Sequence, residues 1–172
     1  MPTLAEVLKL LKEAPNMLIN IEIKAPSETP AVLARYNYKL ACQIVKEHID
    51  WFQVEERTII SSFVSLVTKQ MKAIAPVRNF QILQLLNYGG LEKNGYPTPR
   101  GMQGINLDLH YLDQDVIEKT QTNGNAVAVW YWTKTESEND QVYNLLFGKT
   151  GNKIDYFYSD QPMEAMRARD AI

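Results

Sequence analysis

Six short apolar segments alternate with helical patterns along almost the whole chain, and this alternation constrains the fold more than any other feature of the sequence. The segments are 17–24, 57–63, 80–86, 104–109, 126–133 and 154–159. Each is bounded by Pro, Gly, Asn or a charged residue, and most are rich in β-branched or aromatic residues, which favours strands over buried helices. Strands that alternate with helices predict right-handed βαβ units and a parallel sheet. The predicted fold class is therefore α/β.

Helix signals fill most of the intervals between these strands. Thr3 and Glu6 form a capping-box pattern before the first helix, and the apolar stripe of 30–52 predicts one long helix. Asp160 is predicted to cap the last helix, and Gly124 suits the left-handed residue that follows a helix end. Shorter helices are predicted around 67–74, at 116–122, around 142–147 and at 163–169.

Composition and charge exclude several classes of protein. The chain has 172 residues, of which 45% are hydrophobic, which is typical of one globular domain over 1–172. Its net charge of −2 offers no basic field for nucleic acid. The chain has a single cysteine, Cys42, so it cannot form an intrachain disulfide. No segment reaches the roughly 18 consecutive apolar residues that a transmembrane helix needs. No signal-peptide pattern opens the chain, so the location stays open with the cytoplasm as the default.

The stretch 87–103 is the exception to the alternation. It is rich in Gly and Pro where a helix is expected, so the sequence predicts a long loop there. Loops of this length are often functional, and a plain surface excursion is the alternative.

Polar residues near the end of the first strand form the best candidate site. Asn20, Glu22 and Lys24 alternate with isoleucines, which places the three polar side chains on one face. Ligands of parallel α/β sheets gather at the carboxyl ends of the strands. A carboxylate there suits a divalent cation, and an ammonium suits a phosphate oxygen. The alternative is a buried ion pair with a purely structural role.

Aromatic and histidine side chains lie near other strand ends. Trp130 and Trp132 share one face of their strand, as either the wall of a pocket or core aromatics. His110 follows the fourth strand, where it either reaches a site or makes an ordinary loop hydrogen bond. His48 lies on the long predicted helix and is expected to be a packed or partly exposed helix residue.

Several motifs, in this order and approximate spacing, resemble the glycerophosphodiester phosphodiesterase family over essentially the whole chain. They are Met1-Pro-Thr-Leu4 before a short amphipathic helix, Ile19-Asn-Ile-Glu-Ile-Lys24, Ile59-Ile-Ser-Ser-Phe63, a Trp-containing strand ending in Thr133, and Ser159-Asp-Gln-Pro162. The resemblance implies a parallel (β/α) TIM barrel that hydrolyses glycerophosphodiesters to an alcohol and glycerol 3-phosphate with a divalent cation. It implies that Glu22 is a metal ligand, that Lys24 contacts the phosphate, and that Trp130 or Trp132 lines the substrate pocket.

The family's opening segments are not found in this sequence. They comprise a His-Arg strand, a Glu-x-Asp strand and a His-Asp segment, which supply the acid-base histidines and the other metal ligands. A complete barrel needs about 250 residues. The chain therefore resembles the C-terminal portion of a barrel, with six of eight strands and the two N-terminal strands missing. Because Mg²⁺ and Ca²⁺ need several oxygen ligands, we expect neither ion to bind this chain alone.

Three hypotheses follow from this resemblance. In the first, the chain is an enzyme fragment that becomes a metal-dependent phosphodiesterase when the missing strands complete the barrel. In the second, it is a catalytically inactive structural or interaction subunit of a larger assembly. In the third, it binds a phosphate ligand through Lys24 without chemistry. We expect no catalytic residue in the chain as it stands, and no activity of the chain alone.

The two outermost predicted strands imply a partner. A six-stranded sheet with eight-strand geometry leaves the edges of 17–24 and 154–159 unpaired, and neither strand carries the Pro or Lys residues that protect natural edges. We therefore expect a protein chain to cover these edges.

Overall fold

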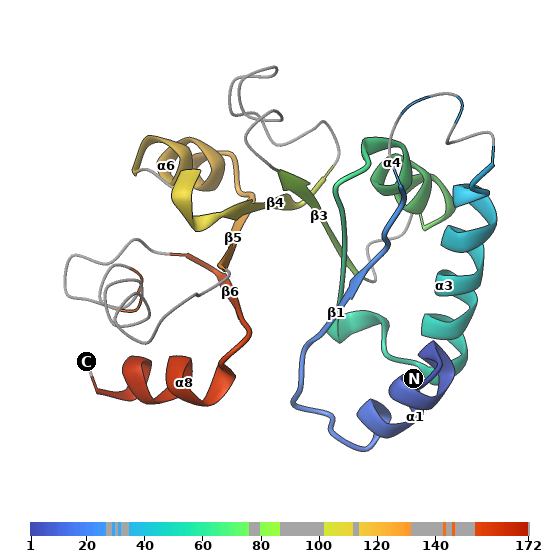
Figure 1. Cartoon of the computed structure of the whole chain (residues 1–172), viewed down its shortest axis with the longest axis horizontal. Helices are drawn as coiled ribbons and strands as arrows, with labels where there is room; N and C mark the ends of the chain where they lie inside the picture. The colour runs from blue at the N-terminus through green and yellow to red at the C-terminus, as the bar shows by residue number, and fades with distance from the viewer. Residues whose placement is uncertain are drawn as a thin grey trace. The chain divides into compact units, whose positions relative to one another are not determined.

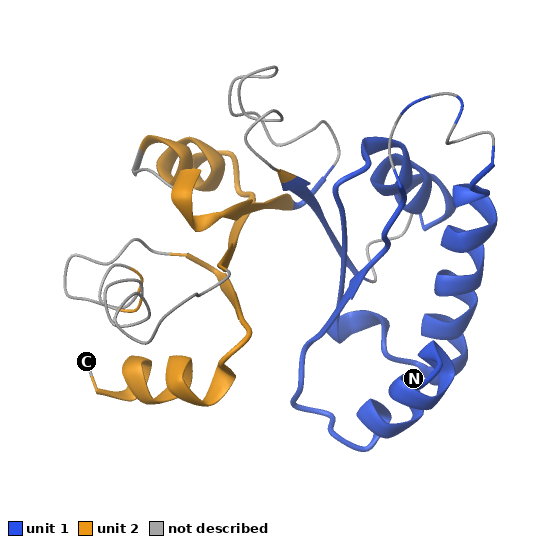
Figure 2. Cartoon of the chain, viewed as in Figure 1, with its two compact units in different colours: residues 1–85, 99–103 blue, residues 86–98, 104–172 orange. Residues whose placement is uncertain are grey.

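The computed structural model describes residues 1–26, 29, 31, 35–75, 80–86, 102–111, 114–131, 143, 146 and 154–171. The chain divides into two compact units (Figure 2). Unit 1 comprises residues 1–85 and 99–103, and unit 2 comprises residues 86–98 and 104–172. In both units, strands and helices alternate along the chain (Figure 1).

Unit 1 is built on three parallel strands. Its elements are α1 (Leu4–Lys12), β1 (Ile19–Glu22), α3 (Tyr38–Phe52), the short 3-10 helix η1 (Glu55–Arg57), β2 (Thr58–Ser62), α4 (Ser65–Ile74) and β3 (Gln81–Leu86). β1 pairs with β2, and β2 pairs with β3, so the strand order follows the chain. The predicted strand 17–24 is wrong at its ends, because Met17 and Leu18 are exposed and the ladder begins at Ile19.

Local hydrogen bonds set the start of α1 and α3. At α1 the predicted capping box is present, because Thr3 N–H donates to Glu6 Oε2 and Glu6 N–H donates to Thr3 Oγ1. The bond from the Thr3 backbone lowers the pKa of Glu6. At α3 the predicted continuous helix over 30–52 is wrong: residues 35–37 are not helical, and the Asn37 side chain caps the helix by accepting the Leu40 N–H at 3.0 Å.

The side chain of Arg57, which lies just before β2, donates hydrogen bonds to backbone carbonyl oxygens at and after the end of α1. Its Nη1 donates to the carbonyl oxygens of Ala14 and Met17, at 2.8 and 3.0 Å, and its Nη2 donates to the carbonyl oxygen of Leu11 at 2.7 Å. Leu11 lies in the last turn of α1, and Ala14 and Met17 lie in the segment that follows it, so the guanidinium connects this segment to the start of β2. The sequence pattern placed Arg57 at the start of the predicted strand 57–63 and did not indicate these hydrogen bonds.

The core of unit 1 lies between the strands and the helices. Ile60 of β2 and Ile82 of β3 pack with Leu8 of α1 and Val67 of α4. Because side chains alternate along a strand, the neighbouring positions Ser61 and Leu83 point to the other face, in register with Glu22.

Unit 2 repeats this arrangement with its own three parallel strands. Its elements are β4 (Gly104–Asp108), the 3-10 helix η2 (Leu109–Tyr111), α6 (Gln114–Thr122), β5 (Ala126–Tyr131), β6 (Tyr156–Ser159) and α8 (Pro162–Asp170). β4 pairs with β5, and β5 pairs with β6. Gly124, at φ 72°, takes the left-handed conformation that its position after a helix predicts.

The last helix begins differently from the prediction. Pro162 occupies its first turn, as expected, but the capping position belongs to Gln161 and has no side-chain cap. Asp160 lies one residue too early to cap α8, so its predicted role is wrong. Ser159 Oγ accepts the Gln161 N–H at 2.9 Å instead.

The sheet of unit 2 has one apolar face and one more polar face. Ile105, Leu107, Val127 and Val129 pack with Val116 and Ile117 of α6. The alternate positions form what we call the polar face of unit 2, which comprises Asn106, Asp108, Ala128, Trp130, Tyr156 and Tyr158. Across the ladder, Asp108 is in register with Trp130, and Trp130 with Tyr158.

Two further expectations concern the chain as a whole. Within the described ranges, no helix is both long and apolar enough to cross a membrane. The single domain over 1–172 stays a prediction, and so does the long loop at 87–103, because its residues 87–101 lie outside the described residues.

Candidate functional site

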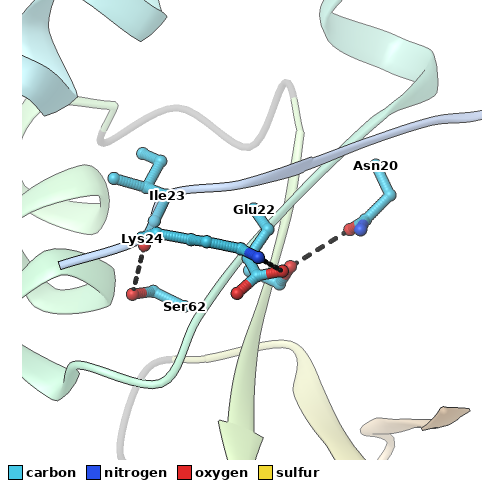
Figure 3. A network of polar contacts seen from close by, with 6 residues as sticks. Asn20, Glu22, Ile23, Lys24 and Ser62 are labelled. Atoms are coloured by element: carbon cyan, nitrogen blue, oxygen red, sulfur yellow. Dashed lines mark hydrogen bonds and ion pairs between the residues drawn. The ribbon is translucent and has the colours of Figure 1, made fainter. Parts of the chain in front are cut away.

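The carboxyl end of β1 carries the residues that the sequence singled out. Ile19 and Ile23 are buried in the core of unit 1, whereas Asn20, Glu22 and Lys24 lie on the exposed side. Figure 3 shows the side chains of Glu22 and Lys24 turned toward each other, with Lys24 Nζ 3.9 Å from Glu22 Oε2. The Lys24 side chain is 82% exposed and that of Glu22 is 31% exposed. The alternative of a buried ion pair is therefore wrong for these two residues.

Hydrogen bonds from β2 hold β1 in place around this pair. Ser61 Oγ donates to Asn20 Oδ1 at 3.2 Å, and Ser62 Oγ donates to the carbonyl oxygen of Ile23 at 2.7 Å (Figure 3). Ser62 Oγ also accepts the Val64 N–H at 3.2 Å. The first bond joins two side chains and the second reaches the backbone just after Glu22, so the carboxylate extends from a strand end that β2 supports.

Gln84 of β3 extends this support into the buried part of unit 1. Its Nε2 donates to the carbonyl oxygens of Ser62, Phe63 and Leu85, at 2.9, 3.2 and 3.0 Å. Its Oε1 accepts the Thr68 hydroxyl at 2.8 Å, and the Gln84 side chain is only 3% exposed. The sequence analysis missed this residue, although a glutamine inside the apolar run Phe80–Leu86 was a visible signal, because a buried polar group needs partners.

A divalent cation does not fit the described residues by themselves. Glu22 contributes one carboxylate, and the ammonium of Lys24 lies 3.9 Å from it. Mg²⁺ and Ca²⁺ both need several oxygen ligands. Throughout the described portion of the chain, no group of three or more His, Cys, Asp or Glu side chains is placed to hold a metal ion. What the strand end offers directly is an exposed positive charge beside a carboxylate.

The carboxyl end of β4 in unit 2 carries a second pair of polar side chains, Asp108 and His110. Asp108 Oδ1 accepts both the backbone N–H of His110, at 3.0 Å, and a hydrogen bond from His110 Nδ1, at 2.6 Å. The side chain of Asp108 is 20% exposed and that of His110 is 65% exposed. The imidazole also lies 5.5 Å, between ring centroids, from Tyr131. His110 therefore makes the ordinary local bond that the sequence allowed, and it remains accessible at a strand end.

Aromatic side chains flank this pair on the polar face of unit 2. Trp130 is half-buried and lies beside Asp108 in the ladder, while Trp132 lies outside the described residues. Burial, with a smaller contribution from the charge of Tyr156, raises the pKa of Tyr158 to about 12. The Tyr158 hydroxyl is thus protonated at neutral pH.

The other candidate side chains have structural surroundings. His48 lies on α3, where its Nδ1 contacts the Ile44 carbonyl oxygen at 2.7 Å, as a partly exposed helix residue. Cys42 is fully buried and its Sγ donates to the Val67 carbonyl oxygen at 3.7 Å. Burial raises the pKa of the Cys42 thiol to about 11, so this group is no nucleophile at neutral pH.

Comparison with known proteins identifies related sequences and structures. No model of a protein family matches the chain. A segment of 62 residues, 36% of this chain, is 39% identical to the glycerophosphodiester phosphodiesterase of Bacillus altitudinis, of which it covers 22%. The sequence similarity is therefore local, and it is to a member of the family that the chain's motifs resemble.

Solved structures match nearly the whole chain. A Silicibacter pomeroyi protein assigned as a glycerophosphoryl diester phosphodiesterase matches 99% of this chain with a TM-score of 0.76 and 17% identity. A glycerophosphodiester phosphodiesterase of Parabacteroides distasonis matches 99% with a TM-score of 0.70 and 19% identity. A phosphodiesterase of Oleispira antarctica, solved with sn-glycerol-3-phosphate, matches 98% with a TM-score of 0.68 and 18% identity.

These matches confirm the predicted fold class. The chain has the α/β fold of part of a TIM-type barrel, and its resemblance to the family is supported by both sequence and structure. It spans 57%, 64% and 61% of the three solved chains, respectively.

Proposed function

We propose that this chain, which shares its fold and a homologous segment with the glycerophosphodiester phosphodiesterases, supplies part of an active site for phosphoric diester hydrolysis. The fold match over 99% of the chain carries the proposal. It is supported by the position of Glu22 and Lys24 at the carboxyl end of β1, the end of parallel strands at which α/β barrels build their active sites.

Each proposed site residue has a separate role. Lys24, whose side chain is 82% exposed, binds a phosphate oxygen through a charge-assisted hydrogen bond. Glu22 provides one of several oxygen ligands for Mg²⁺ or Ca²⁺ in a completed barrel. Trp130 or Trp132 forms the apolar wall of the pocket for a glycerophosphodiester substrate.

These residues meet only part of the chemical requirement. Diester hydrolysis needs a base for the attacking nucleophile, an acid for the leaving alkoxide and neutralisation of charge on the phosphoryl oxygens. Glu22 and Lys24 serve only the third need. We therefore propose that catalysis depends on additional strands that carry the family's His-Arg, Glu-x-Asp and His-Asp segments.

Two open strand edges suggest where additional polypeptide would bind. Among the described residues, β1 pairs only with β2, and β6 pairs only with β5. A cavity of about 640 Å³ lies along β6 and α8, between side chains that include Tyr156, Tyr158 and Met166. We propose that a protein chain covers both edges.

A catalytically inactive subunit is the second candidate function. It is favoured by one observation, the single carboxylate that the described residues place at the end of β1. In that case the chain keeps the fold and an assembly role and has lost the chemistry.

Reconstitution tests both functions. The 172-residue chain is assayed for glycerol 3-phosphate release from glycerophosphocholine with Mg²⁺ or Ca²⁺, alone and co-expressed with a polypeptide carrying the family's first two strands. We expect no release by the chain alone and release by the complex. Glu22→Gln should abolish that release, whereas Glu56→Gln, at an exposed position in η1, should leave it intact.

The outcomes separate the proposals. A complex that forms and shows no turnover favours the inactive subunit. Turnover by the isolated chain that Glu22→Gln abolishes would overturn the dependence on further strands.

A further inference from the structure

The side of α3 that faces away from its buried residues carries large apolar side chains. Cys42 and Ile49 lie on the buried side and pack in the core of unit 1. On the opposite side, Leu40 and Ile44 are 50% and 43% exposed, and Trp51 is 80% exposed. An exposed tryptophan beside other exposed apolar residues is typical of an interaction surface.

These side chains form one continuous stripe. Ile44 lies four residues after Leu40, and Trp51 lies seven residues after Ile44, and both spacings return to the same face of an α-helix. His48, which is partly exposed and lies one turn after Ile44, is between them. We call Leu40, Ile44, His48 and Trp51 the outer stripe of α3.

The described elements of unit 1 leave the outer stripe exposed. α1 and α4 pack against α3, and Figure 1 shows α1 beside the C-terminal end of α3. In a parallel α/β barrel the helices form the outer ring, so the outward side of a helix faces solvent. Additional strands that pair with the edges of β1 and β6 therefore give the outer stripe no partner.

A hollow lies at one end of the outer stripe. It has a volume of about 300 Å³ and lies between α1 and the C-terminal half of α3, where it is lined by Ala5, Glu47, His48, Trp51 and Phe52. The half-exposed side chain of Leu40 lies at the other end of the stripe. A surface with an apolar side chain at one end and a hollow at the other is complementary to a second copy of itself that runs in the reverse direction.

The charges beside the outer stripe favour the same direction. Lys39 is exposed near the start of α3, and Asp50 is exposed near its end. They are eleven residues apart, as are Leu40 and Trp51, and eleven residues make almost three whole turns of a helix. When two copies of α3 run antiparallel with Leu40 opposite Trp51, the same register therefore brings Lys39 close to Asp50 of the second copy. A parallel pair would place each of these charges beside its like.

A lipid surface fits the outer stripe less well than a second copy. Helices that lie on membranes are rich in Lys and Arg on their polar side. Beside the outer stripe, Lys39 and Lys46 are balanced by Glu47 and Asp50, and Lys46 pairs with Asp50 within the helix. Balanced charges on the flank suit a protein partner that carries the same two signs.

We propose that the outer stripe of α3 binds the outer stripe of a second copy of this chain, with the two helices antiparallel. The interface is symmetric, so Leu40 of each copy packs beside Trp51 and the hollow of the other. Glu22, Lys24 and the strand edges take no part in it, so the proposal is independent of the proposed function.

Sedimentation velocity of the full chain over a range of concentrations tests this interface. We expect self-association that Ile44→Glu weakens about tenfold or more, because the substitution places two carboxylates at the centre of the interface. Met163→Glu is the matched control, since Met163 is an apolar residue of α8 that is 61% exposed, and it should leave the association unchanged. The circular dichroism spectra of both variants should match that of the parent chain.

Cross-linking tests the direction of the two helices independently of Ile44→Glu. Lys39→Cys and Asp50→Cys each place a thiol at an exposed position, and the buried Cys42 does not compete for the reagent. In a mixture of the two variants, a short bis-maleimide should join the copies. Neither variant should cross-link with itself, because its two introduced thiols would lie about 16 Å apart along the helices.

Three results would overturn the proposal. They are a chain that sediments as a 19.7 kDa monomer at every concentration, an association that Ile44→Glu leaves unchanged, and cross-linking that is absent from the mixture or occurs within a single variant. Assembly through strand edges alone would give the second result. A monomer that binds phosphatidylcholine vesicles, and binds them less tightly after Ile44→Glu, would assign the outer stripe to a membrane surface instead.

Discussion

At the scale of single residues, the alternation of Asn20, Glu22 and Lys24 with isoleucines was enough to predict a shared face. Period-two patterning is a property of the strand itself, so it is visible in the sequence. The exposure of Lys24 was not predictable, because it depends on which segments pack over the strand end. Gln84 was missed for a related reason: its partners on β2 and α4 are distant in the sequence.

Lys24 provides the first residue-scale prediction. Because its side chain is 82% exposed, its ion pair with Glu22 contributes at most about 1 kcal/mol to folding. We expect Lys24→Gln to leave the urea unfolding midpoint almost unchanged and to weaken binding of glycerol 3-phosphate by the reconstituted barrel about tenfold or more. Lys9→Gln, on the exposed side of α1, is the control and should affect neither. Unchanged binding by Lys24→Gln would remove this residue from the site.

Gln84 supports the second prediction. Gln84→Leu removes its bonds to three carbonyl oxygens and to Thr68 inside a buried region, so we expect the free energy of unfolding to fall by about 2–3 kcal/mol. Chemical denaturation measures the change. Gln43→Leu is a suitable comparison, since that glutamine bonds only to Glu47 on the exposed side of α3, and we expect a change within about 0.5 kcal/mol. Equal effects of the two variants would show that the Gln84 network does not stabilise unit 1.

Tyr158 predicts how stability changes in alkaline solution. Burial raises its pKa to about 12, above the ordinary value of 10.0, so the folded chain holds this proton more tightly than the unfolded chain. Its contribution is complete below pH 10 and is lost as the pH rises toward 12. We expect Tyr158→Phe to flatten the decline of unfolding free energy between these values, followed by denaturation at several pH values. A decline of the same slope in both proteins would contradict this assignment.

At the scale of elements, the sequence predicted which helices and strands exist better than it predicted where they begin and end. The six strands lie where alternation and turn residues placed them, and the first helix has its predicted capping box. The prediction of one helix over 30–52 was wrong, because an apolar stripe does not indicate which residue caps the start of a helix. Within that predicted helix, the apolar residues Leu40 and Ile44 are 50% and 43% exposed, while Cys42 and Ile49 are buried.

The cap of α3 can be tested by substitution. Asn37→Ala removes the oxygen that accepts the Leu40 N–H, and we expect a loss of about 1 kcal/mol in unfolding free energy. Asn37→Asp retains the acceptor and should restore most of the loss. Asn16→Ala, at an exposed turn outside any helix, serves as the control. If Asn37→Ala and Asn16→Ala behave alike, the start of α3 is set by packing alone.

At the scale of the whole molecule, the order of strands followed from the βαβ pattern, whereas the division into two compact units did not. Sequence patterns report which face of each element is apolar, and contact density between distant elements is not encoded in any local pattern. For the same reason, the composition that fits one domain gives no information on how contacts cluster within it.

Assembly is the prediction at this scale. Among the described residues, β1 and β6 each pair with one strand, and an edge strand of a sheet is a template for further pairing. We expect light scattering after size-exclusion chromatography to give a mass above 19.7 kDa, either as a self-assembly or with a co-purified chain. Hydrogen exchange should be slow in both edge strands. A well-folded monomer whose edge strands exchange rapidly would contradict the prediction.

The side chain of Arg57 connects two parts of unit 1 that are far apart in the sequence. α1 can start by itself, because its capping box joins residues only three apart. Its C-terminal anchor joins Arg57 to carbonyls that lie 40, 43 and 46 residues earlier. The last turn of α1 also has local bonds, because the Glu13 N–H donates to the carbonyl oxygens of Leu10 and Leu11. Closing so long a loop delays a contact relative to local structure, so we expect the contacts of Arg57 to form after the helix itself.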